Sequence, residues 1–209
     1  MIVWLGRGTY YNTFQAIKNA GIDVVWIPYK SHSFLFRGLT KATSIFYKLI
    51  YGKGSSTHSR LMAKLHSLFI NKKLIDSVDL LFIPGQIEIV VGLRSNKPII
   101  YYIDGTFNKM INYYWFDFSL NAIEEGNRME QLAVEKSKYN FRASEWAAQS
   151  TINDYGASRK DTYVFPFGAD VPNNIKRAKL LGYKSNKLKF LERNGIEKVE
   201  ILLLQSLSI

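Results

Sequence analysis

The stretch from Phe141 to Val171 constrains the fold most, because its start and stop signals define a helix followed by a strand. Ser144 is a favourable N-cap residue, and Glu145 places an acid in the first turn, beside the positive end of the helix dipole. Gly156 can adopt the left-handed conformation that ends a helix, and the apolar residues at 162–165 then predict a short buried strand. The stretch therefore predicts a helix–turn–strand unit of a sheet protein.

Other apolar runs have the composition of strands and alternate with helical patterns. The run at 24–27 is continuously apolar, which is typical of a strand in a parallel sheet covered on both faces. Helices are predicted at about 10–19, 123–137 and 145–155. The fold predicted is α/β, a doubly wound and mainly parallel Rossmann-like sheet with helices on both faces. The predicted strands lie near residues 2–5, 23–28, 79–83, 98–103, 139–143 and 162–165.

Length and composition limit what else the chain can be. A chain of 209 residues favours one domain plus an extension. Cysteine is absent, which rules out disulfides and thiolate metal sites, and His58 and His66 have no partners at metal-ligand spacing. We expect neither a metal nor a cofactor. No apolar run reaches the roughly 20 residues of a membrane span, and no secretory signal is recognisable, so a cytoplasmic location is predicted.

Three groups of residues near the end of the predicted sheet carry a resemblance to a known family. They are Ser144-Glu145-Trp146-Ala147-Ala148, Asp154-Tyr155-Gly156 and Val164-Phe165-Pro166-Phe167-Gly168-Ala169. In this order they resemble the end of the N-terminal domain of bacterial family 4 glycosyltransferases, which have the two-domain GT-B fold. A generic last unit of any Rossmann-like domain would explain the spacing but not the residue identities.

The resemblance implies a function and a division of the chain. Residues 1–172 would be the acceptor-side domain of an enzyme that transfers a sugar from a nucleotide sugar to a glycan or lipid-linked acceptor. Residues 173–187 would be a linker, and 188–209 a remnant strand with a displaced tail. Ser144, Glu145 and Trp146 would lie on the acceptor side, and the interdomain hinge would comprise Pro166, Phe167 and Gly168.

A glycine loop follows the first predicted strand. Gly6, Gly8 and Thr9 stand where phosphate oxygens can reach backbone N–H groups at a helix start. The complete G-x-G-x-x-G pattern is absent because Tyr11 occupies the third glycine position, so a dinucleotide site is not supported. A tight strand-to-helix turn is the alternative. The resemblance implies that the loop faces the donor diphosphate.

Asp104 is the best catalytic candidate, because it directly follows the predicted strand at 98–103. A carboxylate there can accept a proton from an acceptor hydroxyl or orient a sugar. Its alternative role is to cap the next helix through an Asx turn. The resemblance places Asp104, Gly105 and Thr106 in the segment that lines the acceptor site. It also matches the acidic helix of Glu130, for which we predict a buried polar contact, with a surface carboxylate as the alternative.

The aromatic segment 113–118 also has two interpretations. Planar rings suit the apolar faces of sugars, and they equally suit a hydrophobic lid over the core.

Residues 34–74 are basic and aromatic. Phe36, Leu39, Ile45, Phe46, Leu49 and Ile50 are predicted to share one helix face, beside Arg37, Lys41, Lys48 and Lys53. A second helix is predicted from about Arg60 to Lys73. These helices either dock on an anionic membrane surface, making the protein peripheral at the inner face of the membrane, or pack on the sheet with solvated lysines. A docking module without catalysis is therefore the alternative function.

The net charge of +11 implies an anionic partner of some kind. No nucleic-acid-binding motif accompanies the charge, so we do not expect a nucleic-acid partner.

The last residues, 192–209, have no resemblance as written. If the third base of each codon is read with the first two bases of the next, the region from Asn194 can encode Trp-Asn-Arg-Lys-Gly-Gly-Asn. In the resembling enzymes a Trp-x-Arg-Lys-Gly-Gly segment opens the C-terminal domain and supplies an Arg-Lys pair to the donor phosphates. The sequence thus suggests a frameshifted, prematurely ended glycosyltransferase. Arg193 and Lys198 lie in the displaced tail and cannot take those roles, so little transferase activity is expected of this chain alone.

Overall fold

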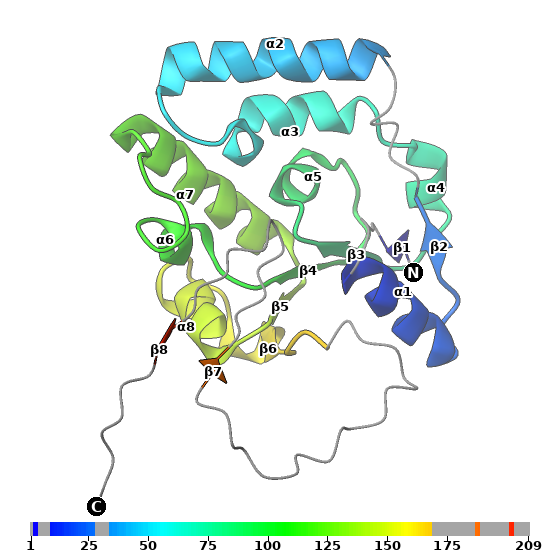
Figure 1. The fold of residues 1–209 in the computed structure, drawn as a ribbon. Coiled ribbons are helices and arrows are strands. Elements are labelled where there is room, and N and C mark those ends of the chain that lie inside the picture. The colour runs from blue at the N-terminus through cyan, green and yellow to red at the C-terminus, as the bar shows by residue number, and fades with distance from the viewer. Residues whose placement is uncertain (1, 4–8, 28–33, 169–186, 189–200, 203–209) are drawn as a thin grey trace, which may run out of the picture. The chain divides into compact units, whose positions relative to one another are not determined.

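The computed structural model describes residues 2–3, 9–27, 34–168, 187–188 and 201–202. The chain divides into two compact units, residues 1–170 and residues 171–209. The first unit is an α/β layer structure, in which the described strands form one parallel sheet (Figure 1). In the second unit, β7 (Lys187–Leu188) pairs antiparallel with β8 (Ile201–Leu202).

The sheet of the first unit has the strand order β2-β1-β3-β4-β5-β6, and every neighbouring pair is parallel. The sheet is small, because β1 and β2 have two residues each and β6 has three. All six predicted strands are confirmed, and within the described residues their bounds differ from the predicted ones by at most two residues. These are β1 (Ile2–Val3), β2 (Val25–Trp26), β3 (Leu81–Pro84), β4 (Ile99–Ile103), β5 (Tyr139–Arg142) and β6 (Thr162–Val164).

The helices follow the strands in alternation, and several have clear start signals. Ser119 caps α7 by accepting a hydrogen bond from the Ala122 N–H, and Ser144 caps α8 through the Ala147 N–H, as predicted. The described helices are α1 (Thr9–Asn19), α2 (Phe34–Tyr51), α3 (Arg60–Ser67), α4 (Lys72–Asp76), α5 (Ile87–Gly92), α6 (Phe107–Met110), α7 (Leu120–Lys136) and α8 (Glu145–Asn153). Two 3₁₀ turns lie at Ser56–His58 and Arg159–Asp161.

The alternation of side chains along β4 shows how both faces of the sheet are buried. Ile99, Tyr101 and Ile103 point to one face, into a core shared with α3, α5 and α7. Ile100 and Tyr102 point to the other face, which α1 covers in part. Because all five residues of β4 are buried, the strand is continuously apolar, as a central parallel strand should be. The arrangement is compatible with a Rossmann-like fold.

Two predictions for residues 34–74 are wrong. The predicted helix from Arg60 to Lys73 is two helices, because α3 ends at Ser67 and α4 begins at Lys72, where Asn71 caps it. Phe36 does not share the face of the other apolar residues of α2, because it is buried against Met62 and Leu65 of α3. The remaining apolar side chains predicted for that face are exposed.

Candidate functional site

The carboxyl edge of the sheet is the candidate functional site, because a parallel sheet brings the loops after its strands to one edge. Backbone hydrogen bonds continue the pairing beyond the strands there. The Gly85 N–H donates to the Tyr102 carbonyl over 2.9 Å, and the Ala143 N–H donates to the Ile103 carbonyl over 3.0 Å. The loops after β3, β4 and β5 are thereby held side by side.

The strand order reverses its direction of growth between β1 and β3, which is where open parallel sheets bind ligands. After β3, Gly85 has a positive φ of 65° and turns the chain into Gln86, the N-cap residue of α5. The Gln86 Oε1 atom is buried and has no hydrogen-bond partner within the described part of the chain. An acceptor held in this way could receive a hydrogen bond from a ligand hydroxyl. Gly6 and Gly8 lie outside the described residues, and Thr9 is the first residue of α1.

Asp104 stands exposed at the end of β4. Its Oδ1 accepts a hydrogen bond from the Gly105 N–H over 3.0 Å, which is a local turn contact of the predicted capping kind. The other carboxylate oxygen has no contact of this kind among the described residues. The turn role and a role toward a ligand are therefore compatible in the geometry.

Gly105 lies against the side chains of Met110 and Trp146. A Cβ atom at Gly105 would stand 2.4 Å from the Met110 Cε and 3.2 Å from the Trp146 ring. The structure thus brings Trp146 of α8 to the loop after β4, as the prediction of a shared acceptor side requires. Trp146 is half exposed and also contacts the Tyr113 ring at a centroid distance of 5.7 Å.

Ser144 and Glu145 stand beside this loop but differ in role. Ser144 is occupied as the N-cap of α8, whereas the Glu145 side chain is exposed in the first turn. The Ser144 hydroxyl is therefore engaged within the helix cap, whereas the Glu145 carboxylate is exposed at the edge.

Thr106 is fully buried and begins a polar network under the site. Its hydroxyl lies 2.6 Å from the Ser150 hydroxyl, which in turn donates to Asp154 over 2.6 Å. Burial raises the pKa of Asp154, but hydrogen bonds from Ser150 and Asn108 and the charge of Lys109 outweigh it, so the pKa is lowered. Thr106 therefore supports the loop rather than contacting a ligand.

Glu130 makes the buried polar contact that was predicted for it, and the alternative of a surface carboxylate is wrong. It is 2% exposed, and it accepts a hydrogen bond from the Phe107 N–H at the start of α6. Burial raises its pKa to about 7, although the charge of Arg142 and the Phe107 N–H work in the opposite direction. The Phe107 contact ties the carboxyl group to the start of α6, whereas its Oε1 atom is buried and has no hydrogen-bond partner among the described residues.

Arg142 is the largest fully buried side chain among the described residues. Its guanidinium donates to the Tyr101 and Phe141 carbonyls over 2.9 Å each, to the Thr151 hydroxyl and to Asn140. Burial lowers its pKa, which the neighbouring Glu130 charge partly offsets. The residue joins β4, β5 and α8 directly below the edge.

Pro166, Phe167 and Gly168 follow β6 and remain exposed. The Tyr102 hydroxyl donates to the Phe165 carbonyl over 2.7 Å, and the Phe167 ring packs on Tyr102 at a centroid distance of 4.8 Å. This segment therefore crosses from β6 onto the end of β4, and it ends the first compact unit.

The aromatic segment divides between the two predicted roles. Trp115 and Phe118 are half-buried and pack on the buried Phe107, and His58 also contacts this cluster, so these rings cover part of the core. Tyr113, Tyr114 and Phe116 are exposed, and Tyr113 joins the Trp146 side of the edge.

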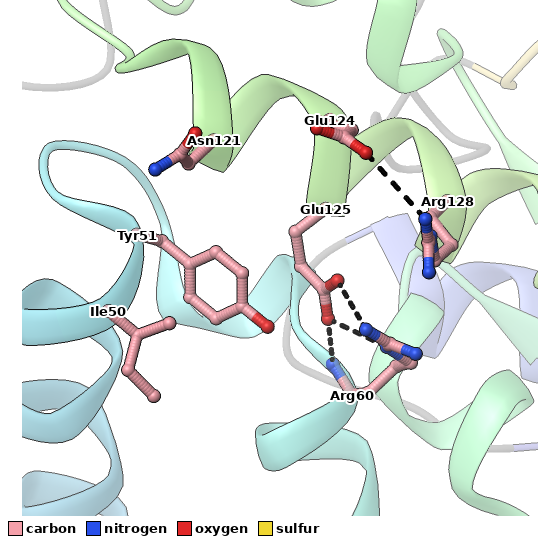
Figure 2. Close-up of a pocket in the computed structure, with 7 residues that line it drawn as sticks. All are labelled: Ile50, Tyr51, Arg60, Asn121, Glu124, Glu125 and Arg128. Atoms are coloured by element: carbon pink, nitrogen blue, oxygen red, sulfur yellow. Dashed lines mark hydrogen bonds and ion pairs between the residues drawn. The ribbon is translucent and has the colours of Figure 1, made fainter.

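A surface pocket of about 210 Å³ lies elsewhere, between α2, α3 and α7. Figure 2 shows the charged side chains inside it paired with one another. Arg60 makes two hydrogen bonds of 3.1 Å to the buried Glu125, and Arg128 lies 3.6 Å from Glu124. The bond to Glu125 raises the pKa of Arg60 further. Because these charges neutralise each other, the pocket has little positive charge left to bind an anion.

A further, largely buried carboxyl group, that of Glu88, lies between α3 and α5. Glu88 Oε1 lies 3.8 Å from His66 Nδ1. Burial raises the pKa of Glu88 to about 7 and lowers that of His66 to about 4. Since both shifts favour the neutral forms, we regard this contact as a neutral one near pH 5 to 6 rather than as an ion pair.

Sequence reasoning gave no role to Arg142 or Thr151. The sequence does contain one indication of a buried polar pair at β5. Asn140 and Arg142 are two positions apart in the strand, so both side chains lie on the same face, and that face is buried. No cluster of His, Asp and Glu suited to a metal ion occurs in the described part of the chain. None of the described helices combines the length and apolar character needed to cross a bilayer.

No model of a known protein family matches the chain, and no similar curated protein was found.

Proposed function

We propose that the chain carries the acceptor-side half of a glycosyltransferase that takes its sugar from a nucleotide sugar and passes it to a glycan or lipid-linked acceptor. The observation that carries the proposal is the position of the motif residues. Asp104-Gly105-Thr106, Ser144-Glu145-Trp146 and Pro166-Phe167-Gly168 follow β4, β5 and β6, which are neighbours in the sheet. Residues that resemble one family in sequence order thus also adjoin at one edge.

The chemistry of the edge suits a sugar hydroxyl. Asp104 is exposed and can accept a proton or a hydrogen bond, and the buried Gln86 Oε1 is an acceptor without a partner among the described residues. The half-exposed indole of Trp146 offers a flat apolar face of the kind that packs on sugar rings.

The donor side is not supplied by these residues. Departure of a nucleoside diphosphate builds negative charge, which requires fixed cations or backbone N–H donors. The resemblance assigns those groups to a second domain, with the loop of Gly6, Gly8 and Thr9 facing it. We therefore expect the 209-residue chain to release nucleotide from a nucleotide sugar at no more than the background rate.

The first experiment is to sequence the coding DNA from codon 186 past the stop. The proposal predicts that the displaced frame reads Trp-x-Arg-Lys-Gly-Gly and stays open for another domain. A protein translated with that frame restored should hydrolyse or transfer sugar from UDP-glucose, GDP-mannose or a related donor.

In the restored protein, Asp104→Asn should lower kcat/KM by about a hundredfold or more, the usual contribution of an acid–base group. Asp79→Asn is the matched control, since Asp79 is equally an exposed aspartate but precedes β3 at the amino edge of the same sheet. A displaced frame that closes at once, or equal activity of both variants, would contradict the proposal.

A further inference from the structure

Helix α2 is the outermost helix of the first unit and packs on α3 (Figure 1). The side that packs on the protein repeats every three or four residues and consists of Phe36, Thr40, Thr43, Tyr47 and Tyr51. Phe36 inserts into the cluster of Met62 and Leu65, and Ser44 lies 2.9 Å from Ser56 at the start of the following 3₁₀ turn. Much of the packed side is thus small and hydroxylated.

The opposite side of α2 is apolar and faces away from the protein. At about 100° per residue, its side chains span an arc of about 160° centred opposite the packed side. Leu49 is 78% exposed, and Phe34 is 93% exposed. The arc comprises Phe34, Leu35, Leu39, Ile45, Phe46, Leu49 and Ile50, all of them exposed. A soluble monomer rarely leaves so many large apolar side chains together on one surface.

A basic stripe lies along one border of this apolar arc. Arg37, Lys41 and Lys48 project between the apolar arc and the packed side, at about 300° to 340° on the same wheel. All three are exposed. No aspartate or glutamate occurs in the sequence between Asp23 and Asp76, so α2 and α3 carry only positive charge of their own. One of these cations, Arg60, is neutralised by Glu125, but the three on α2 have no such ion pair within the described residues.

We propose that the exposed side of α2 docks on an anionic lipid bilayer, lying in the plane of the membrane surface. An apolar arc bordered by lysine and arginine is the arrangement that lets a helix bury its apolar side chains while its cations meet the headgroups. The positive charge of α2 favours lipid over protein as the partner. A protein partner would need acidic residues placed opposite Arg37, Lys41 and Lys48, whereas an anionic lipid surface supplies negative charge along the whole basic stripe. The inference does not depend on the proposed glycosyltransferase function.

The test measures cosedimentation of the complete chain with vesicles of equal parts phosphatidylglycerol and phosphatidylcholine, and with phosphatidylcholine alone. The chain should bind the anionic vesicles, and its partition coefficient should fall as salt rises from about 0.1 M to 0.5 M, where the Debye length falls well below 10 Å. Phe46→Glu should lower the partition coefficient at least tenfold, because it removes an aromatic ring that the bilayer would bury and adds a negative charge that anionic lipid repels.

The matched control is Phe165→Glu. Phe165 and Phe46 are each 54% exposed, and the substitution changes shape and charge identically, but Phe165 follows β6 rather than lying on α2. This variant should change the partition coefficient less than twofold. The double variant Lys41→Gln/Lys48→Gln should lower it about 25-fold, at about fivefold for each charge. Leu49→Glu serves as a second apolar variant, and circular dichroism establishes that each variant is folded.

Three results would overturn the proposal. One is equal binding to the neutral and the anionic vesicles without a salt effect. Another is an equal loss of binding in Phe46→Glu and Phe165→Glu. The third is a chain that ignores vesicles but elutes as a dimer which Phe46→Glu converts to a monomer, because the face would then be covered by a second copy.

Discussion

Replacement of Gly126 by alanine should destabilise the protein although it improves the helix propensity of α7. Gly126 lies within this 17-residue helix, where alanine is ordinarily favoured over glycine by about 1 kcal/mol. A Cβ atom at position 126 would, however, stand 2.0, 2.3 and 2.4 Å from three ring atoms of Phe107. Contacts below 3.0 Å require one of the two groups to move.

The Phe107 ring has no room to move, because it is 1% exposed and contacts His58, Trp115 and Phe118. Overpacking of this kind costs about 1 to 3 kcal/mol, and the depth of the overlap places Gly126→Ala at the upper end. After the gain in propensity is subtracted, the free energy of unfolding should fall by about 2 kcal/mol. The measurement is urea unfolding followed by far-UV circular dichroism.

The control is Gly38→Ala in α2. This glycine is exposed and has no atom within 4 Å of the position of a Cβ, so alanine there should raise the free energy of unfolding by about 1 kcal/mol. The Phe107→Leu substitution, which shortens the ring, should cost less in the Gly126→Ala background than alone. If Gly126→Ala stabilised the protein as much as Gly38→Ala does, the close packing of α6 on α7 would be refuted.

Three further predictions concern Glu88, Gly92 and Arg142. Since the pKa of Glu88 is about 7 when folded and 4.5 when unfolded, its contribution to stability is complete below pH 4.5 and is lost as the pH rises through 7, about 3 kcal/mol in all. In urea unfolding, the parent chain should lose about 3 kcal/mol more than Glu88→Gln between pH 4.5 and 7.5, because Glu130 contributes equally to both chains, and equal pH slopes would count against it. Gly92→Ala should destabilise the chain by about 3 kcal/mol in the same assay, because a Cβ there would stand 2.1 Å from the Ala63 carbonyl oxygen of α3, which cannot rotate away; a neutral effect would show that α3 and α5 can separate. Arg142→Met should cost at least 3 kcal/mol, because it leaves the carbonyl oxygens of β4 and β5 without their donor and removes the positive charge beside Glu130, and a smaller loss than that of Arg142→Lys would exclude this reason.

Much of the sheet was predictable, because its strands are short runs of apolar residues between clear helix signals. β4 was predicted close to its observed bounds, since all five of its residues are buried and apolar or aromatic. β5 was also predicted closely, although its buried face carries the polar residues Asn140 and Arg142. The bounds of α3 were not predicted, because helical periodicity continues past Ser67 and only the cap at Asn71 marks the new start. Phe36 was assigned to the wrong face because its neighbours are equally apolar, and only contact with α3 decides which side of the helix is buried.

The candidate site was predictable in position but not in the function of each member. A residue after a strand in a parallel sheet lies at the carboxyl edge, and this placed Asp104 and Ser144 correctly. Whether such a residue faces solvent or the interior depends on contacts between distant segments. Thr106 and Ser150 are 44 positions apart, and Arg142 contacts the carbonyl of Tyr101 41 positions away. No local pattern contains that information.

This separation of exposed from buried polar groups determines what mutations at the edge can report. Asp104 and Glu145 are exposed, so their replacement by amides changes charge without removing a buried contact. Thr106, Glu130 and Arg142 are buried, so their replacement alters the support of the loops and lowers stability whatever the chain binds. A loss of activity in Asp104→Asn with an unchanged free energy of unfolding would therefore indicate chemistry at the edge. The same loss in Glu130→Gln would have to be corrected for unfolding before it could be attributed to the site.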